Sequence, residues 1–257
     1  MEPNSYLNAI KEKGWVILPD QVDAPLLAEL RDSTDDAYEV CRSIQVKNGI
    51  EANTDGTVHH LLAFQGCFLH FLEKLYCHDI LEGFFKAPYI LNTFGGVINL
   101  PQKASYVANI HRDIRTFYNI PMMMNMLVML DDFTLENGAT YLLSGSHLKD
   151  EKPSEEAFYR SAERAVGKSG SILLFDSLLW HAAGINRTAE PRRALTLAFT
   201  RPFQKQQMDY PRMIGYDRSD SFGEDLKQVL GYNSRIPTSL DEWYQPPNKR
   251  FYKPGQG

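Results

Sequence analysis

Residues 170–199 read GSILLFDSLLWHAAGINRTAEPRRALTLAF, and this stretch carries the clearest structural signal in the chain. Two β-rich runs flank a region that contains the turn-forming residues glycine, asparagine and proline. His181 follows the first run, and the second strand is expected to open with Arg192 and Arg193. The pattern therefore predicts two neighbouring strands that bring a histidine and an arginine to the same part of a β fold.

Further short β-rich runs extend this pattern on the N-terminal side of the quoted stretch. All the runs are separated by turn residues, and they span 89–94, 104–110, 124–133, 139–144, 171–175 and 194–200. Several short strands at this spacing are typical of a β-sandwich or jelly roll.

The first third of the chain has a helical pattern instead. We expect helices over 5–13, from Asp23 as the N-cap to about residue 42, and over 66–85, with a strand at 15–18 and a loop at 44–58. No repeat, low-complexity segment or linker divides the chain, so one domain over 1–257 is the simplest interpretation. Its parts are a helical cover (1–87), a β core (88–201) and a C-terminal wrap (202–257) with a short helix near 222–230.

The composition excludes several classes of protein. Of the 257 residues, 43% are hydrophobic, 23% are charged and 12% are aromatic, which excludes a disordered chain or a fibre. A net charge of −5 supplies no basic field for binding nucleic acid. Three cysteines without a CxxC pair predict free thiols in a reducing compartment. With neither a signal peptide nor a long apolar run, we expect a cytoplasmic protein that does not bind membranes.

Two of the histidines suggest a metal site. In an extended segment, His111 and Asp113 project to one face while Arg112 projects to the other. A third ligand from another strand, such as His181, would complete a two-histidine, one-carboxylate triad of the kind found in non-haem Fe(II) oxygenases. The tripeptide alone is a weak signal, because a surface pair or a hydrogen-bonded pair has the same pattern.

The arginines after His181 add a second element of the same chemistry. A 2-oxoglutarate cosubstrate that chelates iron leaves its distal carboxylate in need of a cation, ideally a bidentate guanidinium. Arg192 and Arg193 lie eleven and twelve residues past His181, on the expected neighbouring strand. Adjacent strand residues face opposite ways, so only one of the two arginines can enter the pocket.

An ordered series of motifs runs through most of the chain. It comprises Gly14-Trp15-Val16, His111-x-Asp113, Leu130-Asp131-Asp132, Glu136-Asn137-Gly138-Ala139, Ser144-Gly145-Ser146-His147, Phe175-Asp176, His181, Asn186, Pro191-Arg192 and Asp241-Glu242-Trp243-Tyr244. In this order the motifs resemble those of the phytanoyl-CoA dioxygenase family of Fe(II)/2-oxoglutarate-dependent oxygenases. The fold that the resemblance implies is an all-β core, a cupin-like double-stranded β-helix or jelly roll, with an N-terminal helical layer (α+β overall). Ser144 stands where the family often has proline.

The resemblance also implies roles for individual residues. His111, Asp113 and His181 match the iron ligands, so the implied cofactors are Fe(II), 2-oxoglutarate and O2. Relatives that halogenate carry a small residue in place of Asp113, so its carboxylate implies hydroxylation, or another oxidative step, on a small molecule, with release of succinate and CO2.

Four further residues are candidates for holding the cosubstrate. Arg192 matches the 2-oxoglutarate anchor, with Arg193 as the fallback. Asn125 lies on the strand that lines the cosubstrate pocket in the family, and its amide is either a donor to 2-oxoglutarate or a hydrogen-bonded core amide. Thr140, on the next strand, is a weaker candidate of the same kind.

Other interpretations remain open at this stage. The same metal site suits a cupin-like isomerase, lyase or hydrolase, and a non-catalytic jelly-roll binding protein would keep structural histidines. His147 is expected to be a structural turn residue, while His59 and His60 either face the substrate entrance or form a solvated pair. Residues 146–169 suggest a lid, although their five cations and five acidic residues indicate no preferred substrate charge. Neither the substrate nor the oligomeric state can be read from the sequence.

Overall fold

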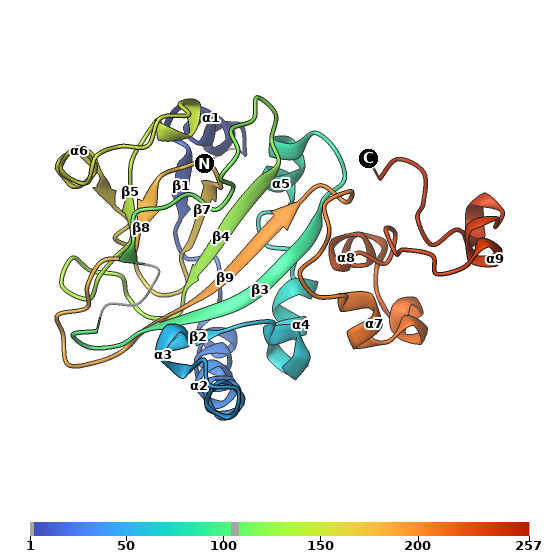
Figure 1. Cartoon of the computed structure of the whole chain (residues 1–257), viewed down its shortest axis with the longest axis horizontal. Coiled ribbons are helices and arrows are strands. Elements are labelled where there is room, and N and C mark those ends of the chain that lie inside the picture. Colours follow the sequence, from blue (N-terminus) through green and yellow to red (C-terminus); the bar gives the residue numbers. More distant parts are fainter. Residues whose placement is uncertain (1–2, 104–107, 257) are drawn as a thin grey trace.

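Two antiparallel sheets form the centre of the computed structural model, which describes residues 3–103 and 108–256 (Figure 1). In spatial order, the large sheet contains β1 (Trp15–Leu18), β7 (Ile172–Asp176), β4 (Met123–Met129), β9 (Arg192–Thr200), β3 (Ile90–Asn99) and β2 (Thr57–Val58). The small sheet contains β6 (Glu163–Arg164), β5 (Tyr141–Leu142) and β8 (His181–Ala182). The chain is therefore a mixed α and antiparallel β structure, and β9 opens at Arg192 as the sequence predicted.

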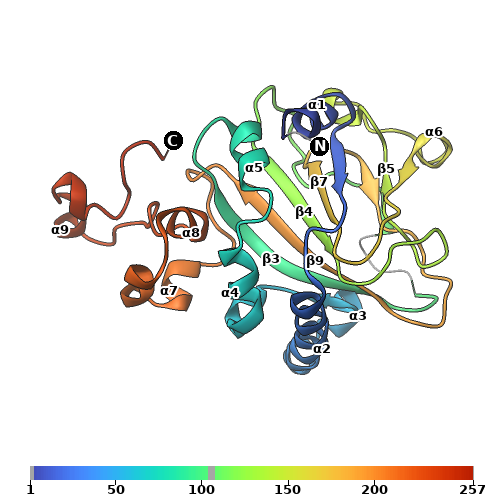
Figure 2. The ribbon, with the colours of Figure 1, turned by 180° about the vertical axis from the view of Figure 1, so that it is seen from behind.

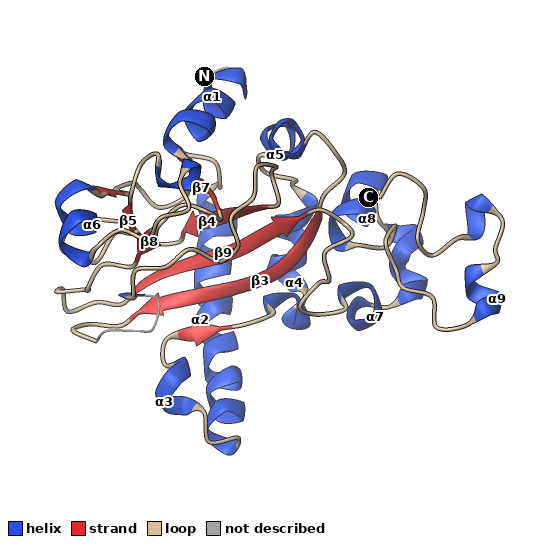
Figure 3. Cartoon of the chain, turned by 45° about the horizontal axis from the view of Figure 1, so that its top comes forward, coloured by secondary structure: helices blue, strands red, loops and turns tan. Residues whose placement is uncertain are grey.

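Helices cover one face of the large sheet. The N-terminal helices are α1 (Pro3–Lys13), α2 (Ala24–Lys47), α3 (Glu51–Thr54), α4 (Gly66–Glu73) and α5 (His78–Phe85). Viewed from behind, α2, α4 and α5 lie over the sheet (Figure 2), and a tilted view shows α2 running across its strands (Figure 3). Among the described helices, none combines the length and the apolar character needed to cross a membrane.

The two faces of the large sheet differ because strand residues alternate between them. On β4, Met124, Met126 and Val128 pack with the helices in the main hydrophobic core. The intervening Leu127 and Met129 belong to a second cluster, which the small sheet and its loops cover. One face is therefore filled by helices, which leaves the other face available for a site.

Three predictions for the first third of the chain, two helices and one loop, need correction. The helix that begins after Asp23 extends to Lys47 rather than to about residue 42, and the expected loop at 44–58 also contains α3 and β2. The predicted helix over 66–85 is two helices, since Leu75 and Cys77 adopt left-handed backbone angles (φ +49° and +63°) that end one helix and start the next. The apolar spacing continues through that break, so periodicity alone did not reveal it.

The strand predicted over 104–110 is absent from the part of that range that the structure describes. Residues 104–107 lie outside the described residues, and 108–110 form no strand. The chain instead joins the small sheet at one point, an isolated antiparallel bridge between His111 and His181. His111 and Asp113 therefore stand on an irregular segment that is held against β8.

The C-terminal part carries α6 (Glu155–Ser161) before β9 and α7 (Tyr210–Ile214), α8 (Glu224–Leu230) and α9 (Leu240–Trp243) after it. Within the predicted wrap, the side chains of Tyr210, Leu226 and Leu230 are buried in the main core. By contrast, α9 extends away from the sheets (Figure 1), and the side chains of Trp243 and Tyr244 are exposed.

Candidate functional site

The structure brings His111, Asp113 and His181 together. One ligand atom from each residue lies within 4.8 Å of the others, a spacing suited to a single metal ion. Reciprocal backbone hydrogen bonds hold the two histidines side by side: His111 N–H donates to the His181 carbonyl (3.0 Å) and His181 N–H donates to the His111 carbonyl (2.9 Å). Their ring centroids are 4.2 Å apart.

Hydrogen bonds at Nδ1 orient both imidazoles. His111 Nδ1 lies 2.7 Å from the Asn109 carbonyl and His181 Nδ1 lies 2.9 Å from the Leu179 carbonyl. A carbonyl only accepts, so each Nδ1 donates its proton there, and each Nε2 is the nitrogen turned toward the carboxylate and available to a metal. The two Nε2 atoms lie 3.7 Å (His111) and 3.8 Å (His181) from the Asp113 carboxylate oxygens. Such partners behind the ring are typical of histidines that bind metals.

Burial keeps one of these imidazoles neutral. Desolvation lowers the pKa of His181, and this outweighs the opposing effect of the Asp113 carboxylate. A metal binds the neutral form of imidazole, so burial prepares His181 for metal binding at neutral pH.

A cavity of about 450 Å³ lies beside the three residues. Alternate residues of three strands form its wall, namely Thr93, Gly95 and Val97 of β3, Met123, Asn125 and Leu127 of β4, and Arg192, Ala194, Thr196 and Ala198 of β9. The small side chains of the central strand β9 leave space above the sheet. The cavity is large enough for a small ligand.

Arg192 reaches this cavity from the start of β9. Its side chain is almost fully buried and its guanidinium stacks on the Phe133 ring, 3.9 Å from the centroid. One terminal nitrogen donates to the Gly138 carbonyl (3.0 Å), while the buried Nε has no hydrogen-bond partner among the described residues. Burial lowers the pKa of Arg192 to about 9. A buried cation without a carboxylate in hydrogen-bond contact is a binding group for an anion that enters the cavity.

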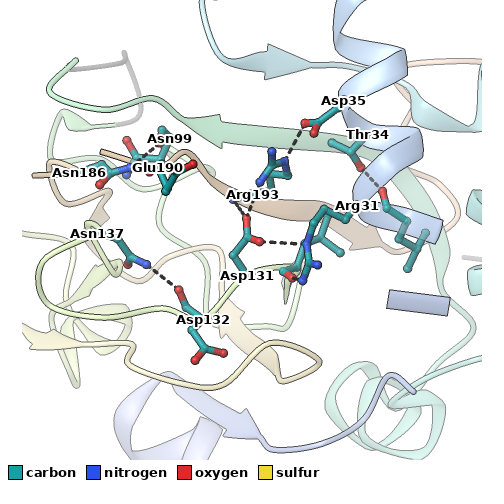
Figure 4. Close-up of polar contacts among 12 residues, drawn as sticks. Arg31, Thr34, Asp35, Asn99, Asp131, Asp132, Asn137, Asn186, Glu190 and Arg193 are labelled. Atoms are coloured by element: carbon teal, nitrogen blue, oxygen red, sulfur yellow. Dashed lines mark hydrogen bonds and ion pairs between the residues drawn. The ribbon is translucent and has the colours of Figure 1, made fainter. Parts of the chain in front are cut away.

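Arg193 points the other way. Its guanidinium forms ion pairs with Asp35 of α2 (2.7 Å) and with Asp131 (3.2 Å), and Asp131 in turn pairs with Arg31 (3.0 Å) (Figure 4). The prediction that only one of the two arginines enters the pocket is therefore confirmed. The strand alternation assigns Arg192 to the cavity and Arg193 to the helical side.

A known family model matches most of the chain. The model of the family described as phytanoyl-CoA dioxygenase (PhyH) matches residues 10–194, well over half of the chain. The chain belongs to the phytanoyl-CoA dioxygenase family. Fe(II), 2-oxoglutarate and O2, the cofactors of this family, are those that the sequence predicted, and its enzymes act on small molecules.

Several curated relatives match over most of their length. An uncharacterised protein of Mycobacterium tuberculosis is 33% identical over 272 residues, covering 100% of this chain and 98% of that protein. The dioxygenase cdmA of Talaromyces verruculosus is 25% identical, covering 91% of this chain and 84% of that protein. Dioxygenase names among the relatives accord with an oxygenase of the Fe(II)/2-oxoglutarate type.

Solved structures share the fold. AviO1 from Streptomyces viridochromogenes matches with a TM-score of 0.62 at 18% identity, covering 79% of this chain and 96% of that chain. The non-haem α-ketoglutarate-dependent epimerase SnoN of nogalamycin biosynthesis matches with a TM-score of 0.57 at 17% identity, covering 77% of this chain and 82% of that chain. Both proteins therefore share the fold of this member of the phytanoyl-CoA dioxygenase family.

Two asparagines of the family motifs hold loops near the site. The Asn137 amide donates to the Asp132 carbonyl (2.7 Å), and the Asn186 amide donates to the carbonyls of Asn99 (2.9 Å) and Glu190 (2.8 Å) (Figure 4). Neither residue lines the cavity. The motifs that contain Asn137 and Asn186 thus specify turns, and these turns position Gly138 and Arg192.

Asn125 and Thr140 both line the cavity, as expected. The Asn125 amide donates to Asp113 Oδ2 at 2.7 Å, so in this structure its partner is a carboxylate of the metal-site cluster. Thr140 is buried, and its backbone carbonyl accepts from Ala165 N–H (2.8 Å).

The remaining candidate histidines separate into two groups. His59 lines the cavity, whereas His60 contacts the Tyr210 hydroxyl through Nδ1 (3.2 Å). His147 lies outside the cavity with Nε2 at 3.2 Å from the Lys11 carbonyl, which accords with a structural role. Gln207 and the wall from β3 were not anticipated, because neither carries a motif. The place of β3 comes from the strand order, and Gln207 is held beside it by a hydrogen bond from its N–H to the Asn92 carbonyl (3.2 Å).

Arg112 connects the metal-site cluster to residues 146–169. It lies on the side away from the cavity, as the alternation predicts, and stacks over Trp180 at 5.2 Å from the ring centroid. Its guanidinium also forms an ion pair with Asp150 (2.6 Å). Since Arg112 and Trp180 each adjoin a histidine of the cluster, this stack joins the two ligand-bearing segments on the face opposite the cavity.

Proposed function

We propose that this chain is an Fe(II)- and 2-oxoglutarate-dependent dioxygenase that hydroxylates a small molecule and releases succinate and CO2. His111, Asp113 and His181 would hold the iron, and Arg192 would bind the distal carboxylate of 2-oxoglutarate, with Thr140 beside it. Bound iron would supply the chemistry in which O2 and 2-oxoglutarate convert a substrate C–H bond into C–OH.

The observation that carries this proposal is the shared cavity of the triad and Arg192. Two imidazoles and one carboxylate are donors suited to Fe(II), and they leave coordination positions free. The unpartnered Nε of buried Arg192 is a polar atom that a carboxylate would satisfy. A redox-neutral metal enzyme has no need of this second anion site.

The chain's own residues have separable tasks in this reaction. Carbonyl partners at Nδ1 keep both imidazoles in the tautomer that presents Nε2. The Phe133 ring and the Gly138 carbonyl hold the Arg192 guanidinium at a fixed depth. The apolar side chains of Leu127 and Phe175, on the cavity side of the sheet, limit water beside the triad.

The lining also supports a class of substrate. Apart from histidines, the charged side chains on the described wall are Asp113 and Arg192, and both are assigned to the metal and the cosubstrate. A further charge on the substrate would be buried without a counter-ion, which is costly. The part of the substrate that enters the cavity is therefore uncharged, with His59 and Gln207 available as hydrogen-bonding groups.

The architecture that accompanies this function is a jelly roll. We infer that the large and small sheets are the two halves of a double-stranded β-helix within one domain. Similarity to the fold of AviO1 and SnoN supports this assignment. The main hydrophobic core draws on residues from Ile10 to Tyr232, which supports the single domain.

The test is an anaerobic addition of Fe(II) and 2-oxoglutarate, followed by O2 and measurement of succinate. The wild-type protein is expected to form succinate, and Asp113→Ala is expected to form none because one ligand is lost. Asp36→Ala, an exposed carboxylate on α2, is the matched control and should retain the wild-type yield. A wild-type protein that binds no Fe(II), or that binds it and leaves 2-oxoglutarate unconsumed, would refute the proposal.

A further inference from the structure

We propose that Asn125 is a positioning residue for the metal site, which holds the Asp113 carboxylate in its metal-binding orientation. The sequence left two other roles open for Asn125, a hydrogen-bond donor to 2-oxoglutarate and a hydrogen-bonded core amide. This inference rests on the proposed function, because it assigns the third ligand of that metal site to Asp113.

Asp113 needs an external restraint because its segment is irregular. It lies in no strand, and its backbone is held by a hydrogen bond from its N–H to the Ser177 carbonyl (3.0 Å). Its side chain remains about one-third exposed (32%). A carboxylate in this setting has rotamers that point into solvent as well as toward the histidines.

The Asn125 amide supplies that restraint. Its Nδ2 donates to Asp113 Oδ2 at 2.7 Å, which is the only hydrogen bond to this carboxylate among the described residues. With Oδ2 held, Oδ1 lies 3.7 Å from His111 Nε2 and Oδ2 lies 3.8 Å from His181 Nε2. The carboxylate is thereby placed between the two nitrogens that would share the metal with it.

Asn125 is itself held more firmly than the carboxylate. It lies within β4, paired with Phe175 of β7 on one side and with Ala198 of β9 on the other. Its side chain is almost fully buried, with 8% of its surface exposed. A donor that is fixed by two strand pairings can orient a ligand on an irregular segment, whereas the reverse is not possible.

The partner at Asp113 also determines which end of the amide faces the carboxylate. An ionised carboxylate only accepts hydrogen bonds, so the NH2 group of Asn125 must face it. Arg192 already provides the charged group for 2-oxoglutarate at the start of β9. The two polar groups on neighbouring strands thus serve different parts of the site.

Replacing Asn125 by Leu removes the donor while keeping a similar size, and Asn125→Ala is a second variant in case the larger side chain disturbs β4. The matched control is Asn92→Leu, an asparagine that lines the same cavity but donates to the Lys205 carbonyl (2.9 Å). Near-ultraviolet circular dichroism verifies that each variant is folded.

The primary measurement is Mn(II) affinity without 2-oxoglutarate, followed by electron paramagnetic resonance of the free ion. Loss of an outer hydrogen-bond partner of a metal ligand weakens metal affinity by about 10–100-fold, which is the change expected for both Asn125 variants. The 2-oxoglutarate affinity at saturating Mn(II) should change much less, and Asn92→Leu should bind Mn(II) like the wild type.

The outcomes separate this inference from the proposed function. If the wild type binds neither Mn(II) nor Fe(II), both are refuted. If the wild type binds Mn(II) and the Asn125 variants bind it equally well, only the positioning role is refuted. Weakened 2-oxoglutarate binding with unchanged Mn(II) affinity would assign Asn125 to the cosubstrate instead. An equal loss of Mn(II) affinity in Asn92→Leu would refute the positioning role, because the loss would then come from disturbed packing of the cavity wall in general.

Discussion

Substituting the two adjacent arginines separately should produce opposite results, and this contrast tests the cosubstrate site. Arg192→Gln removes a buried guanidinium that faces the cavity, whereas Arg193→Gln removes one that is paired with Asp35 and Asp131. The residues are neighbours in the sequence, so a nonspecific disturbance of β9 would affect both variants alike.

The expected loss of affinity follows from the burial of Arg192. Truncating one partner of a buried, hydrogen-bonded charge pair costs about 2–5 kcal/mol. At about 1.4 kcal/mol per factor of ten, Arg192→Gln should weaken 2-oxoglutarate binding by roughly 30-fold to several thousand-fold. Arg193→Gln should leave that affinity close to the wild-type value.

The stability of the ligand-free protein should change in the opposite order. Burial lowers the pKa of Arg192 to about 9, which means that keeping its guanidinium charged in the folded state costs free energy. Arg192→Gln removes this cost, so the ligand-free variant should be at least as stable as the wild type. Arg193→Gln loses charge-assisted hydrogen bonds worth about 1–3 kcal/mol in total. At roughly 2–4 °C per kcal/mol, its Tm should fall by several degrees.

Thermal shift with 2-oxoglutarate and Mn(II) measures both properties at once. A ligand at 100 times its Kd stabilises the folded state by about 2.7 kcal/mol, whereas at a concentration equal to its Kd it contributes about 0.4 kcal/mol. The wild type and Arg193→Gln should therefore show a clear ligand-dependent rise in Tm, and Arg192→Gln should show almost none. The reasoning fails if Arg193→Gln is the variant that loses this response.

Three further predictions concern the surroundings of the site. Burial raises the pKa of Asp176 to about 6, so the folded state binds its proton more tightly than the unfolded chain and stability falls as pH rises from about 4 to 6. Asp176→Asn should therefore have a larger free energy of unfolding than the wild type at pH 7.5, and the two should be equally stable near pH 4. Urea unfolding at both pH values measures these free energies. The same stability difference at both pH values would contradict the prediction. Gly14→Ala should lower Tm, because Gly14 has φ +89° and an added Cβ would lie 2.6 Å from both His147 Nδ1 and Leu179 Cδ1. Gly49→Ala is the control for backbone strain alone, because Gly49 also has a positive φ (+68°) but an added Cβ there would meet no neighbouring atom. Among candidate substrates of one skeleton, the compound with an uncharged reacting end should stimulate succinate formation, and a preference for its carboxylated or phosphorylated form would overturn the substrate class proposed for the cavity.

The sequence was sufficient for the parts of this protein that depend on short-range patterns. Alternation along extended backbone predicted that His111 and Asp113 would share a face with Arg112 on the other, and that Arg192 and Arg193 of β9 would diverge. Asp23 accepts from Leu26 N–H (3.0 Å) as an N-cap should, and Pro25 stands in the first turn that follows. The order of motifs was specific enough to predict the family, which the comparisons then showed.

Other features were decided only when distant segments packed together. The break between α4 and α5 depends on left-handed angles at Leu75 and Cys77, which the continuous apolar spacing hides. The role inferred for Asn125 depends on a contact with Asp113 across two segments, and the cavity wall from β3 depends on strand order. Periodicity shows which face a side chain occupies, because that property is local. It does not show which side chain lies opposite, because that is determined by how the sheets and their loops pack in three dimensions.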